Sequence, residues 1–254
     1  MVTVELLGSG NAFLPSGRLH SFLAIDRHII IDCPPTALAS LRNAGISPAD
    51  IDTILITHVH GDHVFGFPFL LLERKYISDR EGLKKLTVAG SSGVRERLTQ
   101  LCDLAYPGSL NEIIQSINWV DIPDLEGWTL ERFEVLHDPE VDPHGWMLTN
   151  DEGWSMLHSG DSGPCDELWN RIGKSKFAIV EMGVPEWVPT EHHHRPSDID
   201  KLANKFPDTK IVITHTYIDS DYKILTKEVP KFPDNVIHGE DNMRFELDSN
   251  GSIC

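Results

Sequence analysis

The strongest chemical signal in the sequence is a run of metal-binding side chains, Thr57-His58-Val59-His60-Gly61-Asp62-His63. The run directly follows residues 53–56, an apolar segment that is predicted to be a strand. His58 and His60 are two positions apart, so in an extended chain their side chains point the same way. Gly61 allows the chain to turn and to bring Asp62 and His63 to the same place. Three imidazoles and a carboxylate are a ligand set suited to Zn²⁺ or a similar divalent ion.

More ligands are expected at the ends of later strands, because two metal ions that share a ligand need more donors than one motif supplies. The candidates each lie at the end of a later predicted strand: His137 after 133–136, Asp161 after 156–160 and His215 after 211–214. His144 competes with His137, although the position at a strand end favours His137. His158 lies inside a predicted strand and is interpreted as a packed or supporting histidine rather than a ligand.

The elements that must position these residues alternate between strands and helices. The first half predicts strands over 2–7, 22–25, 28–31, 53–56 and 86–89, a tight turn at Asp26 and Arg27, and helices over 35–44, 67–76 and 93–105. The second half predicts strands near 129–136, 146–148, 154–158, 177–181 and 211–214, and helices over 165–172 and 197–206. A β-rich start followed by helices occurs twice, which predicts an α/β fold, an αββα sandwich of two mixed sheets with helices outside. We expect a single domain over residues 1–254.

The charge balance limits the classes of partner. The chain carries 22 Lys and Arg against 39 Asp and Glu, a formal net charge of −17. Such a surface argues against nucleic-acid binding through many phosphate contacts and against docking on anionic lipid. A small anionic ligand held by metal ions stays compatible, because the ions supply positive charge. The four scattered cysteines, the missing signal-peptide pattern and the lack of a long apolar run predict a cytoplasmic protein outside the membrane.

These residues together resemble the metallo-β-lactamase superfamily. Its tRNase Z-type phosphodiesterase branch is indicated by Leu7-Gly-Ser-Gly-Asn-Ala, Pro15-Ser-Gly-Arg-Leu-His-Ser and Thr214-His215. The resemblance implies two divalent ions per subunit, with Zn²⁺ favoured and Mn²⁺ compatible with the carboxylates. One ion would take His58, His60, His137 and Asp161. The other would take Asp62, His63, Asp161 and His215, so that Asp161 bridges the pair and Asp62 serves catalysis as well as binding. A hydroxide between the ions would be the nucleophile.

A second histidine cluster is Glu191-His192-His193-His194-Arg195-Pro196-Ser197. It is either a solvated loop before a helix that Ser197 caps, or the source of a catalytic acid. In the tRNase Z-like phosphodiesterases the proton donor precedes the last metal-binding histidine by about 22 residues, the spacing of His193 and His215. His194 is an alternative donor and a predicted substrate contact. Glu181 falls where these enzymes pair a carboxylate with that histidine, although Val180-Glu181-Met182-Gly183 departs from the family's His-Glu-Ala-Thr-like run.

Other substrate contacts are implied near the mouth of the site. Arg18, His20 and Ser21 match the branch's Arg-x-x-Ser segment and would contact phosphate, with a structural turn as the alternative. Asp32-Cys33-Pro34 matches the superfamily's Asp-Cys turn, in which Cys33 is interpreted as packing. The aromatic candidates for stacking on a base, or for packing instead, are Trp146, Trp187 and Tyr106.

Length discriminates among the members of the superfamily. True tRNase Z enzymes carry a long tRNA-gripping arm between the positions of His137 and Asp161, which here are 24 residues apart, enough for one hairpin. Gly66-Phe-Pro-Phe-Leu-Leu-Leu-Glu-Arg-Lys-Tyr76 and Leu104-Ala-Tyr-Pro107 resemble the anti-Pycsar cyclic-nucleotide phosphodiesterases. That resemblance implies a homodimer that hydrolyses 3′,5′-cyclic nucleotides, including cCMP and cUMP. The alternatives are another small cyclic phosphodiester hydrolase, a tRNase Z-type endoribonuclease, a lactonase or other ester hydrolase, and a non-enzymatic binding module.

Overall fold

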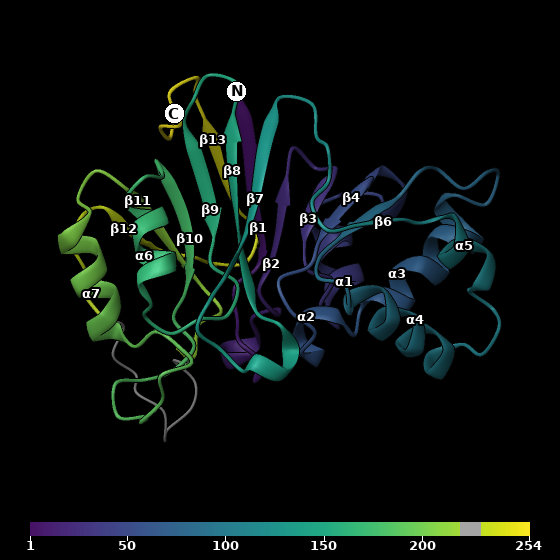
Figure 1. Cartoon of the computed structure of the whole chain (residues 1–254), viewed down its shortest axis with the longest axis horizontal. Coiled ribbons are helices and arrows are strands. Elements are labelled where there is room, and N and C mark those ends of the chain that lie inside the picture. The colour runs from purple at the N-terminus through teal and green to yellow at the C-terminus, as the bar shows by residue number, and fades with distance from the viewer. Residues whose placement is uncertain (219–229) are drawn as a thin grey trace.

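Two mixed β-sheets form the centre of the computed structural model, which describes residues 1–218 and 230–254 (Figure 1). In the first sheet the strands lie in the order β13 (Met243–Leu247), β1 (Val2–Gly8), β2 (Phe22–Ile25), β3 (Ile29–Ile31), β4 (Thr53–Leu55), β5 (Thr87–Ala89) and β6 (Asn118–Val120). In the second the order is β12 (Val236–His238), β11 (Lys210–Thr214), β10 (Phe177–Glu181), β9 (Ser155–His158), β8 (His144–Asn150) and β7 (Trp128–Glu134).

Each sheet is parallel on one side and antiparallel on the other. Strands β3 to β6 are parallel to their neighbours, as are β9 to β12, whereas β13–β1–β2–β3 and β7–β8–β9 are antiparallel. The predicted turn between β2 and β3 is confirmed. Asp26 and Arg27 adopt φ angles of 47° and 63°, and the N–H of His28 donates to the carbonyl of Ile25. Two successive positive φ angles fit the right-handed twist of the flanking strands.

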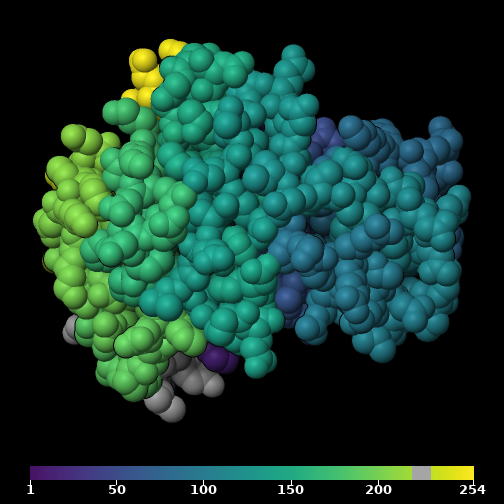
Figure 2. Space-filling model, in the orientation of Figure 1, coloured from purple at the N-terminus to yellow at the C-terminus, as the bar shows by residue number. Residues whose placement is uncertain are grey.

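Three apolar layers hold the sheets and helices together. Helices α1 (Ala37–Asn43), α3 (Phe67–Glu73), α4 (Val94–Ala105) and α5 (Asn111–Ser116) cover the outer face of the first sheet, and α6 (Asp166–Ile172) and α7 (Pro196–Lys205) cover that of the second (Figure 1). Between the sheets lies a third layer that includes Trp146 and Phe177. Burying a side chain of this size contributes about 1.5–3 kcal/mol. The predicted αββα sandwich is confirmed, and its two halves form opposite sides of the molecule (Figure 2).

Several predicted boundaries and elements were wrong. Helix 67–76 leaves α-helical geometry after Glu73 and continues as a π-turn, Arg74–Ser78, in which the fully buried Arg74 pairs with Asp79 at 2.8 Å. The cap of α7 is Arg195 rather than Ser197, whose hydroxyl donates instead to Glu186. The α-helices and β-strands of the described residues that the sequence did not predict are α2 (Gly61–Val64), α5, β6, β12 and β13. Most of these are too short to show a hydrophobic period.

The strands that precede the predicted site residues end at one edge of the sandwich. His58 follows β4, Asp161 follows β9 and His215 follows β11. Glu181, the last residue of β10, pairs in register with Thr214 beside it. The two sheets meet here, because the N–H of His144 donates to the carbonyl of Thr57. No helix within the described residues is long and apolar enough to cross a membrane.

Candidate metal centre

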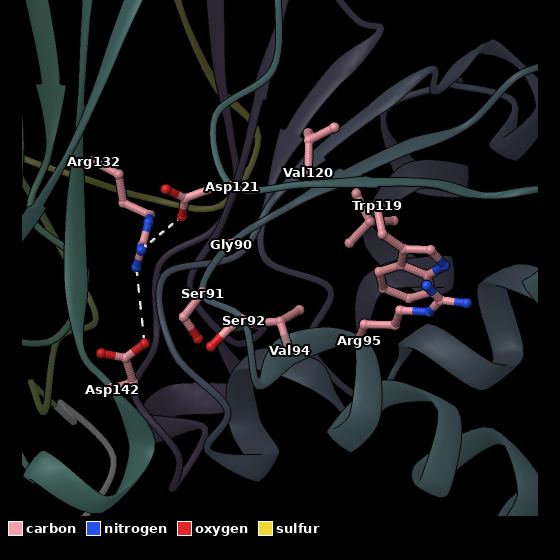
Figure 3. Close-up of a pocket in the computed structure, with 11 residues that line it drawn as sticks. Gly90, Ser91, Ser92, Val94, Arg95, Trp119, Val120, Asp121, Arg132 and Asp142 are labelled. Carbon is pink, nitrogen blue, oxygen red and sulfur yellow. Dashed lines mark ion pairs between the residues drawn. The ribbon is translucent and has the colours of Figure 1, made fainter.

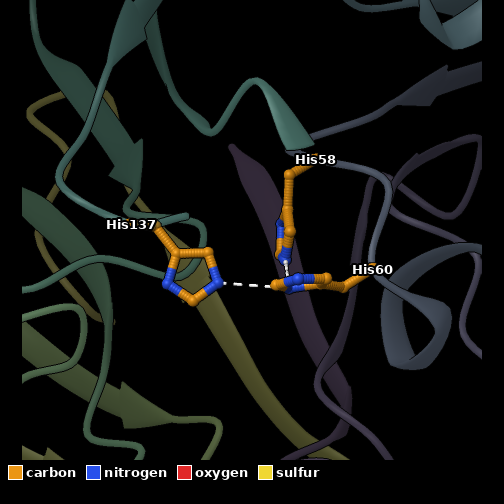
Figure 4. Close-up of side chains that lie close together, drawn as sticks. All are labelled: His58, His60 and His137. Carbon is orange, nitrogen blue, oxygen red and sulfur yellow. Dashed lines mark hydrogen bonds between the residues drawn. The ribbon is translucent and has the colours of Figure 1, made fainter. Parts of the chain in front are cut away.

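Three histidines from two segments direct ring nitrogens at one point (Figure 4). Nδ1 of His60 lies 3.1 Å from Nε2 of His58 and 3.1 Å from Nε2 of His137. His58 and His60 leave β4 in an extended chain, and His137 comes from the loop after β7. The prediction that His137 rather than His144 joins this group agrees with the geometry, since Nδ1 of His144 instead donates to the carbonyl of Asp142 at 2.8 Å.

A second group lies beside the first and contains both predicted aspartates. Its members are Asp62, His63, Asp161 and His215. Nε2 of His215 lies 3.3 Å from Oδ2 of Asp62 and 3.3 Å from Oδ2 of Asp161. Nε2 of His63 lies 3.3 Å from the other oxygen of Asp161. Asp161 Oδ2 is also 4.0 Å from Nε2 of His58, so this carboxylate stands between the two groups.

Asp32 orients a histidine in each group, a role that the sequence analysis did not assign. Its Oδ2 accepts from Nδ1 of His63 at 2.8 Å and from the Thr57 hydroxyl at 2.8 Å. The hydroxyl oxygen of Thr57 in turn lies 3.0 Å from Nδ1 of His58. When Nδ1 donates to such a partner, Nε2 carries the lone pair that binds a metal. The signal in the sequence was an aspartate directly after the apolar segment 29–31. In the structure this aspartate is buried and adopts a φ of 66°.

The electrostatics of the group follow from burial and from opposite charges close together. Burial favours neutral groups, yet Asp161 and Asp32 raise the pKa of His63 well above its usual value. Burial likewise opposes charge on Asp161, while His215 and His63 hold its pKa well below the usual range. For His58, burial dominates and lowers the pKa well below its usual value. A cation at this position would replace the protons that these pairs share.

The donor set fits divalent metal ions. Nitrogen ligands of a tetrahedral zinc with bonds of about 2.0–2.1 Å lie about 3.3 Å apart, close to the separations among His58, His60 and His137. Nε2 of His63 is buried without a hydrogen-bond partner within the described residues. Such an orphaned nitrogen is costly unless a ligand satisfies it. Imidazole and carboxylate donors in this arrangement suit Zn²⁺ or a related divalent ion.

His193 and Glu181 form a pair at the rim of the two groups. Nδ1 of His193 lies 3.0 Å from Oε1 of Glu181, which is almost fully buried at the end of β10. A ring nitrogen of His193 lies within 4.8 Å of ligand atoms of His137 and Asp161. Burial lowers the pKa of His193, but the carboxylate of Glu181 outweighs it and raises the pKa to about 9. The pair therefore holds a proton beside the candidate metal ligands at neutral pH.

The prediction that His194 contacts substrate is wrong. Its side chain is completely buried and both ring nitrogens have protein partners. His193 contacts Glu181 beside the centre, whereas His194 next to it contacts Ser162 and Trp169 in the protein interior.

The side chains of the segment Arg18–Ser21 contact other parts of the protein, as expected for a structural turn rather than a phosphate-binding segment. Nη1 of Arg18 donates to the hydroxyl of Ser9 and to the carbonyl of Gly239, at 2.8 and 3.0 Å. His20 is buried, with its backbone N–H and Nδ1 at 3.2 and 3.3 Å from the Thr36 hydroxyl. The Ser21 hydroxyl lies 2.9 Å from that of Thr214, next to His215. These contacts fix the loop against the base of the centre.

The aromatic residues that were candidates for stacking on a base, and the residues expected to be packed, lie partly in the core and partly at the surface. Trp146 is fully buried between the sheets and its indole donates to the carbonyl of Ile56, so the stacking alternative is wrong for it. Trp187 is 65% exposed, and Tyr106 packs edge-on against Phe69 in the helix layer. His158 is buried, with its Nδ1 accepting from the N–H of Gly160, which agrees with a packed histidine. Cys33 is also buried.

Two cavities lie near this edge of the sandwich. One, of about 510 Å³, borders the centre itself and is lined by residues that include His137, His192, Pro139 and Pro143. The other, of about 560 Å³, lies off the ends of β5 and β6 (Figure 3). In it Arg132 reaches Asp121 at 2.7 Å and Asp142 at 3.9 Å. Asp142 lines both cavities, which places the second beside the first.

Comparison with known proteins agrees with this geometry. A model of the family described as "Anti-Pycsar protein Apyc1" matches residues 2–215. The chain belongs to the anti-Pycsar protein Apyc1 family. This family lies in the tRNase Z-like branch of the metallo-β-lactamase superfamily, in agreement with the resemblance of the sequence. Family membership and the histidine–aspartate groups identify the chain as a metal-dependent hydrolase.

The chain also resembles curated relatives in sequence and solved structures in fold. Ribonuclease Z of Pyrobaculum aerophilum is 23% identical over 85% of this chain and 86% of its own length. The metallo-β-lactamase fold protein YhfI from Bacillus subtilis superposes with a TM-score of 0.74 at 14% identity, covering 96% of this chain and 98% of that one. The short form of human tRNase Z superposes with a TM-score of 0.72 at 19% identity, with coverage of 96% and 98%.

Asp161→Ala should lower the metal content of the protein. The substitution removes the carboxylate that stands between the two ligand groups, and it leaves His63 and His215 without their shared partner. We expect loss of at least one metal equivalent per subunit, measured by elemental analysis after dialysis against trace metal. Asp52→Ala, at an exposed aspartate in the turn before β4 whose side chain contacts His28 and the Thr53 hydroxyl, is the matched control. A variant that keeps the full wild-type metal content would contradict the position given to Asp161.

Proposed function

We propose that this protein hydrolyses 3′,5′-cyclic nucleotides, including the pyrimidine nucleotides cCMP and cUMP. The observation that carries the proposal is the pair of partly buried His193 and buried Glu181, which borders both candidate ligand groups. A carboxylate–histidine pair of this kind serves to deliver a proton to a departing oxygen. Membership of the anti-Pycsar protein Apyc1 family supports a cyclic nucleotide as the substrate class.

The chain would hold two divalent ions, one at His58, His60 and His137 and one at Asp62, His63 and His215, with Asp161 shared. When bound, such ions polarise phosphoryl oxygens and lower the pKa of water to near neutrality. Asp32 and Thr57 keep the histidines in the required orientation. His193 carries a proton at neutral pH because Glu181 stabilises the charged ring. It would pass that proton to the ribose oxygen that leaves phosphorus.

The dimensions of the site support a small substrate. The cavity of about 510 Å³ beside His137 and His192 lies in the size range of small-molecule sites. Between His137 and Asp161, the chain forms the short turn Pro139–Val141 and strands β8 and β9, together with the connections between them. The net charge of −17 opposes the many phosphate contacts that a tRNA would need.

A hydrolysis panel tests the proposal. Purified protein loaded with Zn²⁺ or Mn²⁺ would be offered cCMP, cUMP, cAMP and cGMP beside a lactone, a pre-tRNA and bis-p-nitrophenyl phosphate. We expect turnover of the cyclic mononucleotides that stops when a chelator is added. Cleavage of pre-tRNA alone would favour the ribonuclease alternative, and cleavage of the lactone alone would favour an ester hydrolase. Either result would overturn the proposal.

His193→Ala should separate proton delivery from metal binding. General-acid catalysis contributes about 10²- to 10⁴-fold, so we expect a loss of this size in kcat for a cyclic nucleotide. Bis-p-nitrophenyl phosphate releases a phenolate that needs no proton and should lose far less. Metal content should stay at the wild-type level. Equal losses with the two substrates would contradict the role of His193 as a proton donor.

Glu181→Gln should move the alkaline limb of the pH–rate profile to lower pH. The carboxylate raises the pKa of His193 to about 9, so the protonated ring persists below that pH and is lost as the pH rises through it. Removing the negative charge lowers the pKa of His193, and activity should fall at a lower pH than in the wild type. The measurement is kcat for a cyclic nucleotide across the pH range. An unmoved alkaline limb would show that Glu181 does not tune His193.

We also propose that the protein forms a homodimer through exposed apolar side chains between the end of α2 and the π-turn that follows α3. Phe65, Phe69, Tyr76 and Ile77 are between 47% and 63% exposed along this continuous segment. Exposed aromatic and large aliphatic side chains are enriched at interaction surfaces. Phe69→Glu should shift the mass measured by light scattering from dimer to monomer, whereas Phe13→Glu, at an exposed position in another loop, should not. A wild-type monomer would refute the proposal.

A further inference from the structure

His194 is held in one orientation by two hydrogen bonds inside the protein. Its Nδ1 lies 2.6 Å from the carbonyl oxygen of Ser162, and its Nε2 lies 3.0 Å from the indole nitrogen of Trp169. An indole N–H can only donate and a carbonyl can only accept. The ring must therefore be neutral, with its proton on Nδ1. Burial, which lowers the pKa of His194, agrees with this state.

These two partners connect the histidine loop to the centre and to a helix. Ser162 directly follows Asp161, the aspartate between the two ligand groups, and Trp169 lies in α6. The indole ring is nearly parallel to the imidazole, at 15° and 6.3 Å between centroids. The Lys205 amine of α7 lies 5.6 Å from the centroid of the same indole. His194 thus fastens the loop to the helix layer behind the second sheet.

The loop and the turn at Asp161 also share one carboxylate oxygen. Oε1 of Glu181 accepts from the N–H of Ser162 at 3.1 Å and from the N–H of His194 at 3.2 Å. The same oxygen lies 3.0 Å from Nδ1 of His193. The turn after Asp161 packs closely against the histidine loop, since a Cβ built at Gly163 would lie 1.6 Å from the carbonyl oxygen of Glu191. A shift of the loop would therefore move His193 relative to Asp161.

We propose that His194 is a positioning residue that fixes His193 against Asp161 and so controls proton delivery to the leaving group. The proposal rests on the proposed function, in which His193 is the proton donor. His194 acts through the loop and does not touch substrate or metal. A displacement of about 1 Å can reduce a rate by about 10²-fold. Loosening the loop should therefore slow substrates that need a proton and spare those that do not.

Three variants remove these contacts to different extents. His194→Phe keeps an aromatic ring against Trp169 but makes neither hydrogen bond. His194→Asn retains an amide N–H near the position of Nδ1, and so retains the bond to Ser162. Trp169→Phe keeps a ring in α6 but removes the indole donor, at a residue outside the proposed ligand set. His28→Asn, at an exposed histidine in the turn before β3, is the matched control for a histidine substitution.

The readout is the ratio of kcat for a cyclic nucleotide to kcat for bis-p-nitrophenyl phosphate, together with metal content. In His194→Phe we expect this ratio to fall by about ten-fold or more, in line with the sensitivity of proton transfer to geometry. His194→Asn should recover part of the loss, Trp169→Phe should lie between, and metal content should not change. Equal losses with both substrates, or no loss, would overturn the proposal.

The His193→Ala variant distinguishes failure of the positioning role of His194 from failure of the proton-donor role of His193. If it lowers the ratio and His194→Phe does not, the positioning role of His194 is wrong while the proton donor stands. If His193→Ala leaves the ratio unchanged, the proton-donor assignment fails and the role of His194 fails with it. If the variants at His194 unfold, the ratio in Trp169→Phe decides, and an unchanged ratio there overturns the proposal.

Discussion

The burial of several ionisable side chains at one edge of the sandwich is the constraint on which the rest of the structure depends. Asp161 is 4% exposed and stands among imidazoles of both ligand groups. An isolated charge there would be costly, and histidine–carboxylate pairs offset that cost only if their geometry is held. The hydrogen bonds of Asp32, Thr57 and Glu181 provide that geometry. A bound cation would satisfy Nε2 of His63, which has no hydrogen-bond partner within the described residues and lies 3.3 Å from a carboxylate oxygen of Asp161.

The three consecutive histidines show how one short loop serves a site in different ways. The carbonyl of His192 accepts from Nδ1 of His137 at 3.0 Å and so orients a candidate ligand. The side chain of His193 faces the centre, and that of His194 anchors the loop to α6. The fold itself supports many reactions, so the chemistry depends on such local arrangements rather than on the sandwich. In this chain Glu181 contacts both His193 of the loop and the backbone of Ser162, which directly follows Asp161.

The parts of the site that the sequence predicted are those encoded locally. The run from His58 to His63 brings its side chains together through spacing alone, and His137, Asp161 and His215 follow from their positions at strand ends. The role of Asp32 was missed because its partners, Thr57 and His63, lie 25 and 31 positions away. His194 was misplaced because sequence does not reveal which side of a loop faces the core. Strands of three residues, such as β6 and β12, show no period to detect.

The most direct test of this account is anomalous diffraction from crystals of the metal-loaded protein, recorded on both sides of the absorption edge of the metal. The account predicts two peaks in each subunit. One should lie among His58, His60 and His137, the other among Asp62, His63 and His215, with the Asp161 carboxylate between them. A single peak, or a pair of peaks in which Asp161 contacts neither ion, would contradict the arrangement on which the proposed chemistry rests.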